Sequence, residues 1–269
     1  MKISISVANY DIGLPQIVFR GALEPIFRKV SGMGYQGVDL FLERLDGVDG
    51  RELRKLLDKY HLGVSMLAAP SDMVKEEITM GHPDPAVRRE FFKRSEPQLR
   101  LASQIAAPVV IGYTRGYIKP GLTRNQLTDL FCDSLVDFHK MAEDFGTTLI
   151  LEPINHHELN YINNVDEALE ILHRLKLPRL RLMLDAYHMN IEETSIPLAI
   201  FKAREHLHYF QLVDSNRQAP GWGHTNLREV YLCLKEIGYS GFLGIEVVPV
   251  PDAEKAAVQG IEYVRMLMR

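Results

Sequence analysis

The chain has 269 residues, 46% hydrophobic and 25% charged, which suits a soluble globular protein of one large or two small domains. A net charge of −4 without a basic block argues against nucleic-acid binding. No apolar run is long enough to span a bilayer, and no signal peptide precedes the first strand pattern, so we expect a cytoplasmic protein without a membrane partner. Two isolated cysteines, Cys132 and Cys233, make neither a disulfide framework nor a CxxC metal site.

Short apolar runs alternate with longer amphipathic stretches along the whole chain. In chain order, the predicted strands are residues 3–7, 37–41, 64–68, 109–113, 147–153, 180–185, 207–213 and 242–248. The predicted helices that follow them are residues 22–34, 50–61, 84–106, 123–145, 165–175, 196–206, 227–237 and 253–268. The strands are apolar on both faces, as parallel strands between helices should be.

Eight strand–helix units in this length are typical of a (β/α)8 TIM barrel, an α/β fold of about 250 residues. No linker or change of composition divides the chain, so we predict a single barrel domain over residues 1–269. A doubly wound open sheet is the alternative, but it normally has fewer strands, and no G-x-G-x-x-G follows the first strand. In a barrel, the active site would lie at the C-terminal ends of the strands.

Four predicted strands carry a lone polar residue at or near their C-terminal end. These residues are Glu152, Asp185, Gln211 and Glu246. A buried carboxylate is costly unless it is paired, and three together repel unless one is protonated or a cation lies among them. Oxygen donors of this kind suit Mg²⁺ or Mn²⁺ better than Zn²⁺ or Cu²⁺. A buried polar network without a metal is the alternative.

Strand periodicity and loop composition single out further residues. If Gln211 points into the barrel, His208 points outward, and we interpret it as a packed core histidine. Arg115 follows the fourth strand, where it could pair with a carboxylate or phosphate at the far end of an acidic keto-sugar; a surface salt bridge is the alternative. His156 and Asp214 lie in polar loops, and we weigh ligand contact and a hydrated rim equally for both.

The polar residues in the second half of the chain belong to longer motifs. The motifs are E-P-x-N-x-x-E at 152–158, D-x-x-H-M-N-x-E-E at 185–193, D-S-N-R-x-x-P-G-x-G-H at 214–224, and I-E-V around Glu246. Together they resemble the xylose isomerase-like barrel superfamily, and within it the ketose 3-epimerases related to D-tagatose 3-epimerase. The resemblance extends over nearly the whole chain and is most specific in these motifs.

The resemblance implies that Glu152 and Glu246 are metal ligands and also the acid–base pair. Asp185 would be the third carboxylate ligand, and Gln211 would take the ligand position that many relatives fill with histidine. The residues that would hold the O1–O3 end of a ketose are Glu158, His188 and Arg217. Asn226 and His156 stand where Asp and Arg are common in relatives, and these departures concern the substrate more than the reaction.

The predicted function is therefore a metal-dependent epimerase that inverts C3 of a ketose or keto-sugar acid through an enediolate. Mn²⁺ is the expected metal, with Mg²⁺ or Co²⁺ as alternatives, and the resemblance implies a dimer or tetramer. Three alternatives stay open: an aldose–ketose isomerase of the hydroxypyruvate or xylose type, an inosose dehydratase, and a non-catalytic sugar-binding barrel. An endonuclease of the same superfamily would need more histidine ligands and a basic face.

Overall fold

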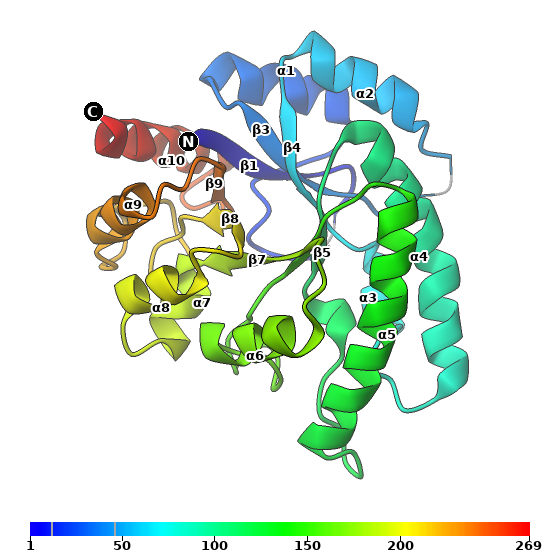
Figure 1. The fold of residues 1–269 in the computed structure, drawn as a ribbon. Coiled ribbons are helices and arrows are strands. Elements are labelled where there is room, and N and C mark those ends of the chain that lie inside the picture. Colours follow the sequence, from blue (N-terminus) through cyan, green and yellow to red (C-terminus); the bar gives the residue numbers. More distant parts are fainter. Residues whose placement is uncertain (12, 46) are drawn as a thin grey trace.

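A ring of parallel strands forms the centre of the molecule, and helices surround it (Figure 1). The structure is a computed structural model that describes residues 1–11, 13–45 and 47–269. The barrel strands of this part are β1 (Lys2–Ala8), β3 (Gly37–Phe41), β4 (Gly63–Leu67), β5 (Val109–Ile111), β6 (Leu149–Leu151), β7 (Leu180–Asp185), β8 (Leu207–Gln211) and β9 (Phe242–Ile245). Each strand pairs in parallel with the next, and β9 closes the ring on β1, where Lys2 lies opposite Phe242. The predicted (β/α)8 barrel is confirmed.

The predicted outer helices are all present. They are α1 (Leu23–Met33), α2 (Gly50–Lys59), α4 (Pro85–Ile105), α5 (Arg124–Asp144), α6 (Val165–Leu175), α8 (Ile196–Ala203), α9 (Leu227–Glu236) and α10 (Ala253–Met268). Side-chain caps set several starts: the Asp84 carboxylate accepts from the Ala86 amide at 2.7 Å, and Thr123 and Gln126 form a capping box on α5. Across the described residues, no helix is long and apolar enough to cross a bilayer.

Four short elements were not predicted: β2 (Phe19–Arg20), α3 (Ser71–Lys75), the 3-10 helix η1 (Tyr113–Arg115) and α7 (Ala186–Glu192). Each is too short to show a periodic pattern of apolar residues. All four follow a barrel strand, so they lie in the connections at the C-terminal end of the barrel. These connections build the rim of the site.

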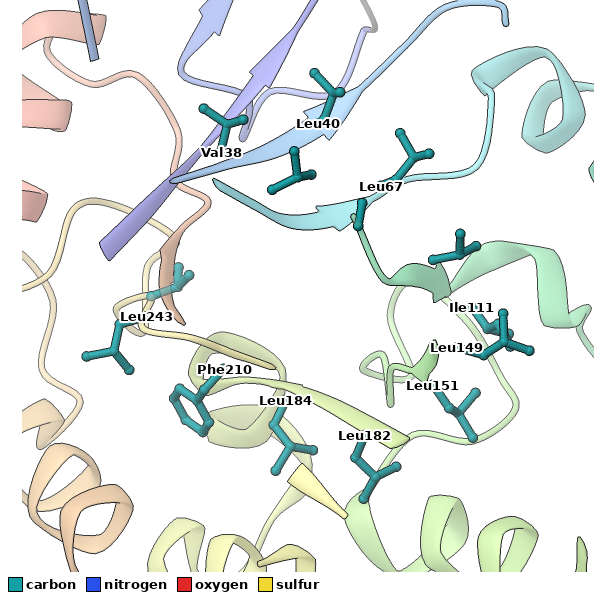
Figure 2. Close-up of a cluster of buried hydrophobic side chains, with 14 of the residues drawn as sticks. Val38, Leu40, Leu67, Ile111, Leu149, Leu151, Leu182, Leu184, Phe210 and Leu243 are labelled. Carbon is teal, nitrogen blue, oxygen red and sulfur yellow. The ribbon is translucent and has the colours of Figure 1, made fainter. Parts of the chain in front are cut away.

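Alternate strand residues separate two apolar layers. Figure 2 shows Leu182 and Leu184 of β7, together with Phe210 of β8, in the layer between the strands and the helices. Met183 and Tyr209, one position away, belong instead to a smaller cluster inside the barrel. This alternation directs Asp185 and Gln211, which follow Met183 and Tyr209 by two positions, toward the inside of the barrel.

The prediction for His208 is wrong. The register between β7 and β8 shifts, so that Leu182 pairs with Leu207 but Met183 pairs with Tyr209. His208 therefore occupies a bulge without a partner on β7, and its side chain is exposed instead of packed under a helix. An irregularity of this kind leaves no mark on the apolar pattern of the strand.

Candidate active site and metal centre

One cavity of about 340 Å³ opens at the C-terminal end of the barrel, and polar side chains line its inner end. Glu152 directly follows β6, Asp185 ends β7, Gln211 ends β8, and Glu246 directly follows β9. Glu152 and Glu246 line the cavity itself. Asp185 and Gln211 are paired in the register of β7 and β8, and they are 1% and 0% exposed. The structure thus brings together the four strand-end residues.

Direct contacts link these residues. Candidate ligand atoms of Glu152, Asp185 and His188 all lie within 4.8 Å of one another. The Gln211 side-chain amide donates to Glu246 Oε2 at 2.6 Å. The arrangement brings three carboxyls and one amide from the ends of four adjacent strands near the His188 imidazole of α7.

Two buried oxygen atoms in this group have no hydrogen-bond partner among the described residues: Asp185 Oδ2 and Gln211 Oε1. The other oxygen of Asp185 accepts from the Tyr187 amide at 2.8 Å, so it caps α7. Unsatisfied buried acceptors are costly, and a cation bound between them would satisfy both. These oxygens fit a hard divalent cation such as Mg²⁺ or Mn²⁺, for which Glu152 and Glu246 are candidate further ligands.

Burial and mutual repulsion keep these carboxyls protonated to higher pH than usual. The pKa of Glu152 is raised well above its ordinary value, first by burial and then by the charges of Glu246 and Asp185. Burial raises the pKa of Asp185 to about 8, although the Arg217 guanidinium opposes the shift. Burial also raises the pKa of Glu246, against the effects of Arg217 and the Gln211 amide. Three carboxyls that resist ionisation together suit a site completed by a cation.

His188 is neutral and has a defined tautomer. Burial, followed by the charge of Arg217, lowers the pKa of His188 to about 3. The Asn155 side-chain amide lies 2.7 Å from His188 Nδ1 and donates to it, which leaves the proton on Nε2. That Nε2 lies 3.8 Å from Asp185 Oδ2 and 3.9 Å from Glu152 Oε1. His188 therefore presents a hydrogen-bond donor to the cavity.

Glu158 and Arg217 also line the cavity, next to the strand-end residues. Arg217 Nη1 donates to Glu158 Oε1 at 2.7 Å, and Arg217 Nη2 lies 3.7 Å from Glu246 Oε1. The Tyr113 hydroxyl donates to Glu158 Oε2 at 2.5 Å, and the Asn155 amide donates to Oε1 at 3.1 Å. Burial alone would lower the pKa of Arg217, but the surrounding carboxylates raise it, so it stays charged. The guanidinium thus connects a candidate substrate contact with a candidate catalytic group.

Arg115 does not fit the substrate contact that its sequence position suggested. Its side chain is 0% exposed and donates to four backbone carbonyls, those of Gly112, Glu152, Tyr161 and Ile162, at 2.8–2.9 Å. Nor is it a surface salt bridge. The guanidinium ties η1 to the end of β6, so Arg115 holds the backbone that carries Glu152.

We expect Arg115→Met to lower the free energy of unfolding by at least about 3 kcal/mol, because four buried carbonyls lose a charged donor. Urea denaturation measures this change. The matched control is Arg100→Met, which removes an exposed pair with Glu96 and should cost less than about 1 kcal/mol. If the Arg115→Met protein were stable and its kcat/KM fell only toward charged substrates, Arg115 would be a substrate contact instead.

Three residues from the polar loops have local structural contacts. Asp214 accepts from the backbone amides of Ser215, Gly221 and Thr225, so it organises the loop after β8. His156 is exposed and pairs with Glu192 at the rim. Asn226 caps α9 by accepting from the Glu229 amide at 3.2 Å.

Asn155 belongs to the E-P-x-N-x-x-E motif, but its role was not specified by the sequence: it is fully buried and connects His188 to Glu158. Asp39 was not recognised from the sequence at all. Asp39 is fully buried inside the barrel, in the strand G-V-D-L-F. A lone carboxylate in an apolar strand is the signal that identified Glu152, but Asp39 lies in mid-strand, away from the end where the active site was expected.

A closed parallel barrel whose last four strands end on three carboxylates and one amide defines a class of TIM-barrel enzyme. The model of the xylose isomerase-like TIM barrel family matches residues 27–267, and the chain belongs to this family.

Its relatives include several ketose 3-epimerases. Fructoselysine 3-epimerase of Escherichia coli O157:H7 is 26% identical over 266 residues, covering 91% of this chain and 94% of that protein. D-psicose 3-epimerase of Ruminiclostridium cellulolyticum is 34% identical over 228 residues, covering 81% and 75% respectively. The crystal structure of D-psicose 3-epimerase from Clostridium cellulolyticum H10 with D-tagatose matches with a TM-score of 0.85 at 20% identity over 100% of both chains, a likeness that shows the fold.

Proposed function

We propose that this protein is a metal-dependent ketose 3-epimerase that inverts C3 of its substrate through an enediolate. The observation that carries the proposal is the group of Glu152, Asp185, Gln211 and Glu246 at one cavity. Two oxygens of this group, Asp185 Oδ2 and Gln211 Oε1, have no hydrogen-bond partner among the described residues. Its relatives named as ketose 3-epimerases support the same reaction class. The oxygen donors suit Mg²⁺ or Mn²⁺, and we propose Mn²⁺ as the metal.

The proposed chemistry needs two groups that move protons on opposite faces of the substrate. When bound, a divalent cation supplies Lewis-acid polarisation of the ketose carbonyl, which makes the C3 proton more acidic. One glutamate removes the C3 proton, and the other returns a proton to the opposite face, which inverts the configuration. Glu158, His188 and Arg217 would hold the hydroxyl groups at the O1–O3 end.

The two glutamates differ in the charges that surround them, although the pKa of both is raised. The pKa of Glu152 is raised by burial and by two neighbouring carboxylates, so Glu152 tends to carry a proton. Burial also raises the pKa of Glu246, and Arg217 and the Gln211 amide oppose the rise. A pair of this kind can act as acid and base at one pH. We assign Glu246 as the base for one epimer and Glu152 as the base for the other.

NMR spectra of D-fructose, D-psicose, D-tagatose and L-ribulose incubated with the enzyme in D₂O and Mn²⁺ test this function. The proposal predicts deuterium at C3 and formation of the C3 epimer. Deuterium at C1 or C2 would instead indicate an aldose–ketose isomerase, which can use the same carboxylates. Binding of a ketose without exchange at any carbon would indicate a non-catalytic barrel.

We propose a neutral ketose as the substrate class. Away from the carboxylates, the cavity walls are largely apolar and include Leu14, Phe41, Met66 and Val110. Arg115, the residue whose position suggested an acidic substrate, donates to backbone carbonyls instead. A higher kcat/KM for a neutral ketohexose than for the matching keto-hexonate is the expected result.

Arg217→Met is expected to move the pH–rate profile. Arg217 lowers the pKa of Glu246, so its removal raises that pKa further. A base must be ionised to act, and the limb on which kcat/KM rises with pH should therefore move to higher pH. Arg217→Lys keeps a charge and should give a smaller shift. An unmoved profile in both variants would mean that Arg217 does not act on the proton-transferring group.

A further inference from the structure

Gln211 differs from an imidazole ligand because an amide can turn either its oxygen or its nitrogen toward a cation. Only the oxygen is a ligand for a hard cation, so something must fix the direction of the side chain. The Gln211 Nε2 group donates to Glu246 Oε2 at 2.6 Å and to Asp39 Oδ2 at 3.2 Å. A reversed amide would place its oxygen against these two acceptors.

Glu246 by itself is an acceptor of variable strength for the amide, because a protonated carboxyl accepts more weakly than a carboxylate. On the proposed function, on which this inference rests, Glu246 gains and loses a proton in every turnover. Asp39 lies deeper in the barrel, does not line the cavity and takes no part in the proposed proton transfers. Its carboxylate can therefore hold the amide in one direction while the protonation state of Glu246 changes.

A set of hydroxyl groups fixes Asp39 in turn. Asp39 Oδ1 accepts from Ser4 at 3.1 Å, from Tyr209 at 2.6 Å and from Ser65. Asp39 Oδ2 accepts from Ser6 at 2.8 Å in addition to Gln211. Every one of these partners can donate, which suits a carboxylate held by its neighbours within the barrel.

Gly244 on β9 makes room for this arrangement. A Cβ at residue 244 would lie 1.7 Å from the Tyr209 hydroxyl and 3.0 Å from Gln211 Cγ. Any larger residue would push the phenol away from Asp39 and displace Gln211. The glycine directly before I-E-V is therefore explained by the same network.

The direction that results leaves Gln211 Oε1 without a partner among the described residues. Asp185 Oδ2, on the residue paired with Gln211 in the neighbouring strand, is orphaned in the same way. We propose that Asp39 is a positioning residue that holds Gln211 with its carbonyl oxygen toward the divalent cation. Asp39 itself does not contact the cation or the substrate.

Calorimetric titration of the metal-free enzyme with Mn²⁺ tests this proposal in a double-mutant cycle. Loss of an outer partner of a metal ligand typically weakens binding by about 10–100-fold, and we expect this for Asp39→Ala. In the Gln211→Ala background, the same substitution should change Mn²⁺ affinity little, because no amide is left to position. A loss of affinity that is equal in both backgrounds, or no loss in either, would overturn the proposal.

Two further variants separate positioning from folding. Ser134→Ala removes a buried hydroxyl that donates to the Met80 carbonyl at 2.9 Å, outside the Asp39 network, and Mn²⁺ affinity should be unchanged; a loss as large as that of Asp39→Ala would overturn the proposal. If Asp39→Ala does not fold, Asp39→Asn keeps the shape, and its loss of affinity must likewise depend on Gln211. A wild-type enzyme that bound no Mn²⁺ would overturn the metal site and this inference together, whereas Mn²⁺ binding without coupling would overturn the inference alone.

Discussion

Glu246→Gln should reduce epimerisation by roughly 10²–10⁴-fold, because glutamine cannot accept or deliver the C3 proton. Glu152→Gln should reduce it to a similar extent. Glutamine keeps a carbonyl oxygen as a ligand, so Mn²⁺ affinity should fall much less than the rate. Initial rates with each epimer, together with Mn²⁺ titrations of the same proteins, separate the two effects.

Proton exchange without epimerisation distinguishes the roles of the two glutamates. If Glu246 is the base for one epimer, Glu246 in the Glu152→Gln protein can still remove the C3 proton of that epimer and return a proton to the same face. That protein should therefore introduce deuterium at C3 of this epimer alone, and Glu246→Gln should do so only for the other epimer. Loss of exchange from both epimers in either variant would contradict the assignment of two bases.

Glu192→Gln is the matched control for these two substitutions. Glu192 is also a partly buried carboxylate near the cavity, but it pairs with His156 at the rim. Its loss should leave both epimerisation and C3 exchange close to wild type. A large effect of Glu192→Gln would indicate that carboxylates in this region act through general electrostatics.

Removal of the divalent metal should abolish the activity, and Mn²⁺ should restore it. It should also make the stability of the protein depend on pH. In the metal-free protein, the pKa of Asp185 is raised to about 8, and those of Glu152 and Glu246 are raised as well. The stabilisation that goes with a raised pKa is complete below the ordinary pKa and is lost as pH rises through the folded value.

His188 has the opposite effect on stability. Its pKa is lowered to about 3 from an ordinary 6.5, so its contribution is complete above pH 6.5 and is lost below it. Above pH 6.5, the three carboxyls determine how stability changes with pH, and the metal-free protein should become less stable toward about pH 8 and beyond. Mn²⁺ binds the ionised carboxylates and releases protons, so its stabilising effect should grow over the same range.

Thermal unfolding in EDTA and in excess Mn²⁺, at about pH 6.5 and about pH 8.5, measures both effects. The difference in Tm between the two conditions should be larger at the higher pH. Asp185→Asn removes the group with the pKa of about 8 and should flatten the pH dependence in EDTA. A metal-free protein whose Tm rose between these two pH values would contradict the assignment.

The sequence carries strong signals for the elements and for the strand-end residues. A carboxylate such as Glu152 or Asp185 in an apolar run is conspicuous, since its burial is too costly to be accidental. Arg115 shows the limit of this reasoning. Arg115 follows a strand, as predicted, but its side chain donates to four backbone carbonyls. Every residue has a backbone carbonyl, so no residue pattern identifies one as a partner.

The order of strands and helices, the barrel and the four strand-end positions followed from the sequence by itself, because apolar periodicity and the cost of burying charge are local properties. Only the tertiary structure decided which atoms of these residues have hydrogen-bond partners. Asp39 is 172 residues from Gln211 along the chain, yet it fixes the direction of the Gln211 amide across the inside of the barrel. Contacts of this kind depend on the register and closure of the sheet, which set the side chains of β3 and β8 face to face.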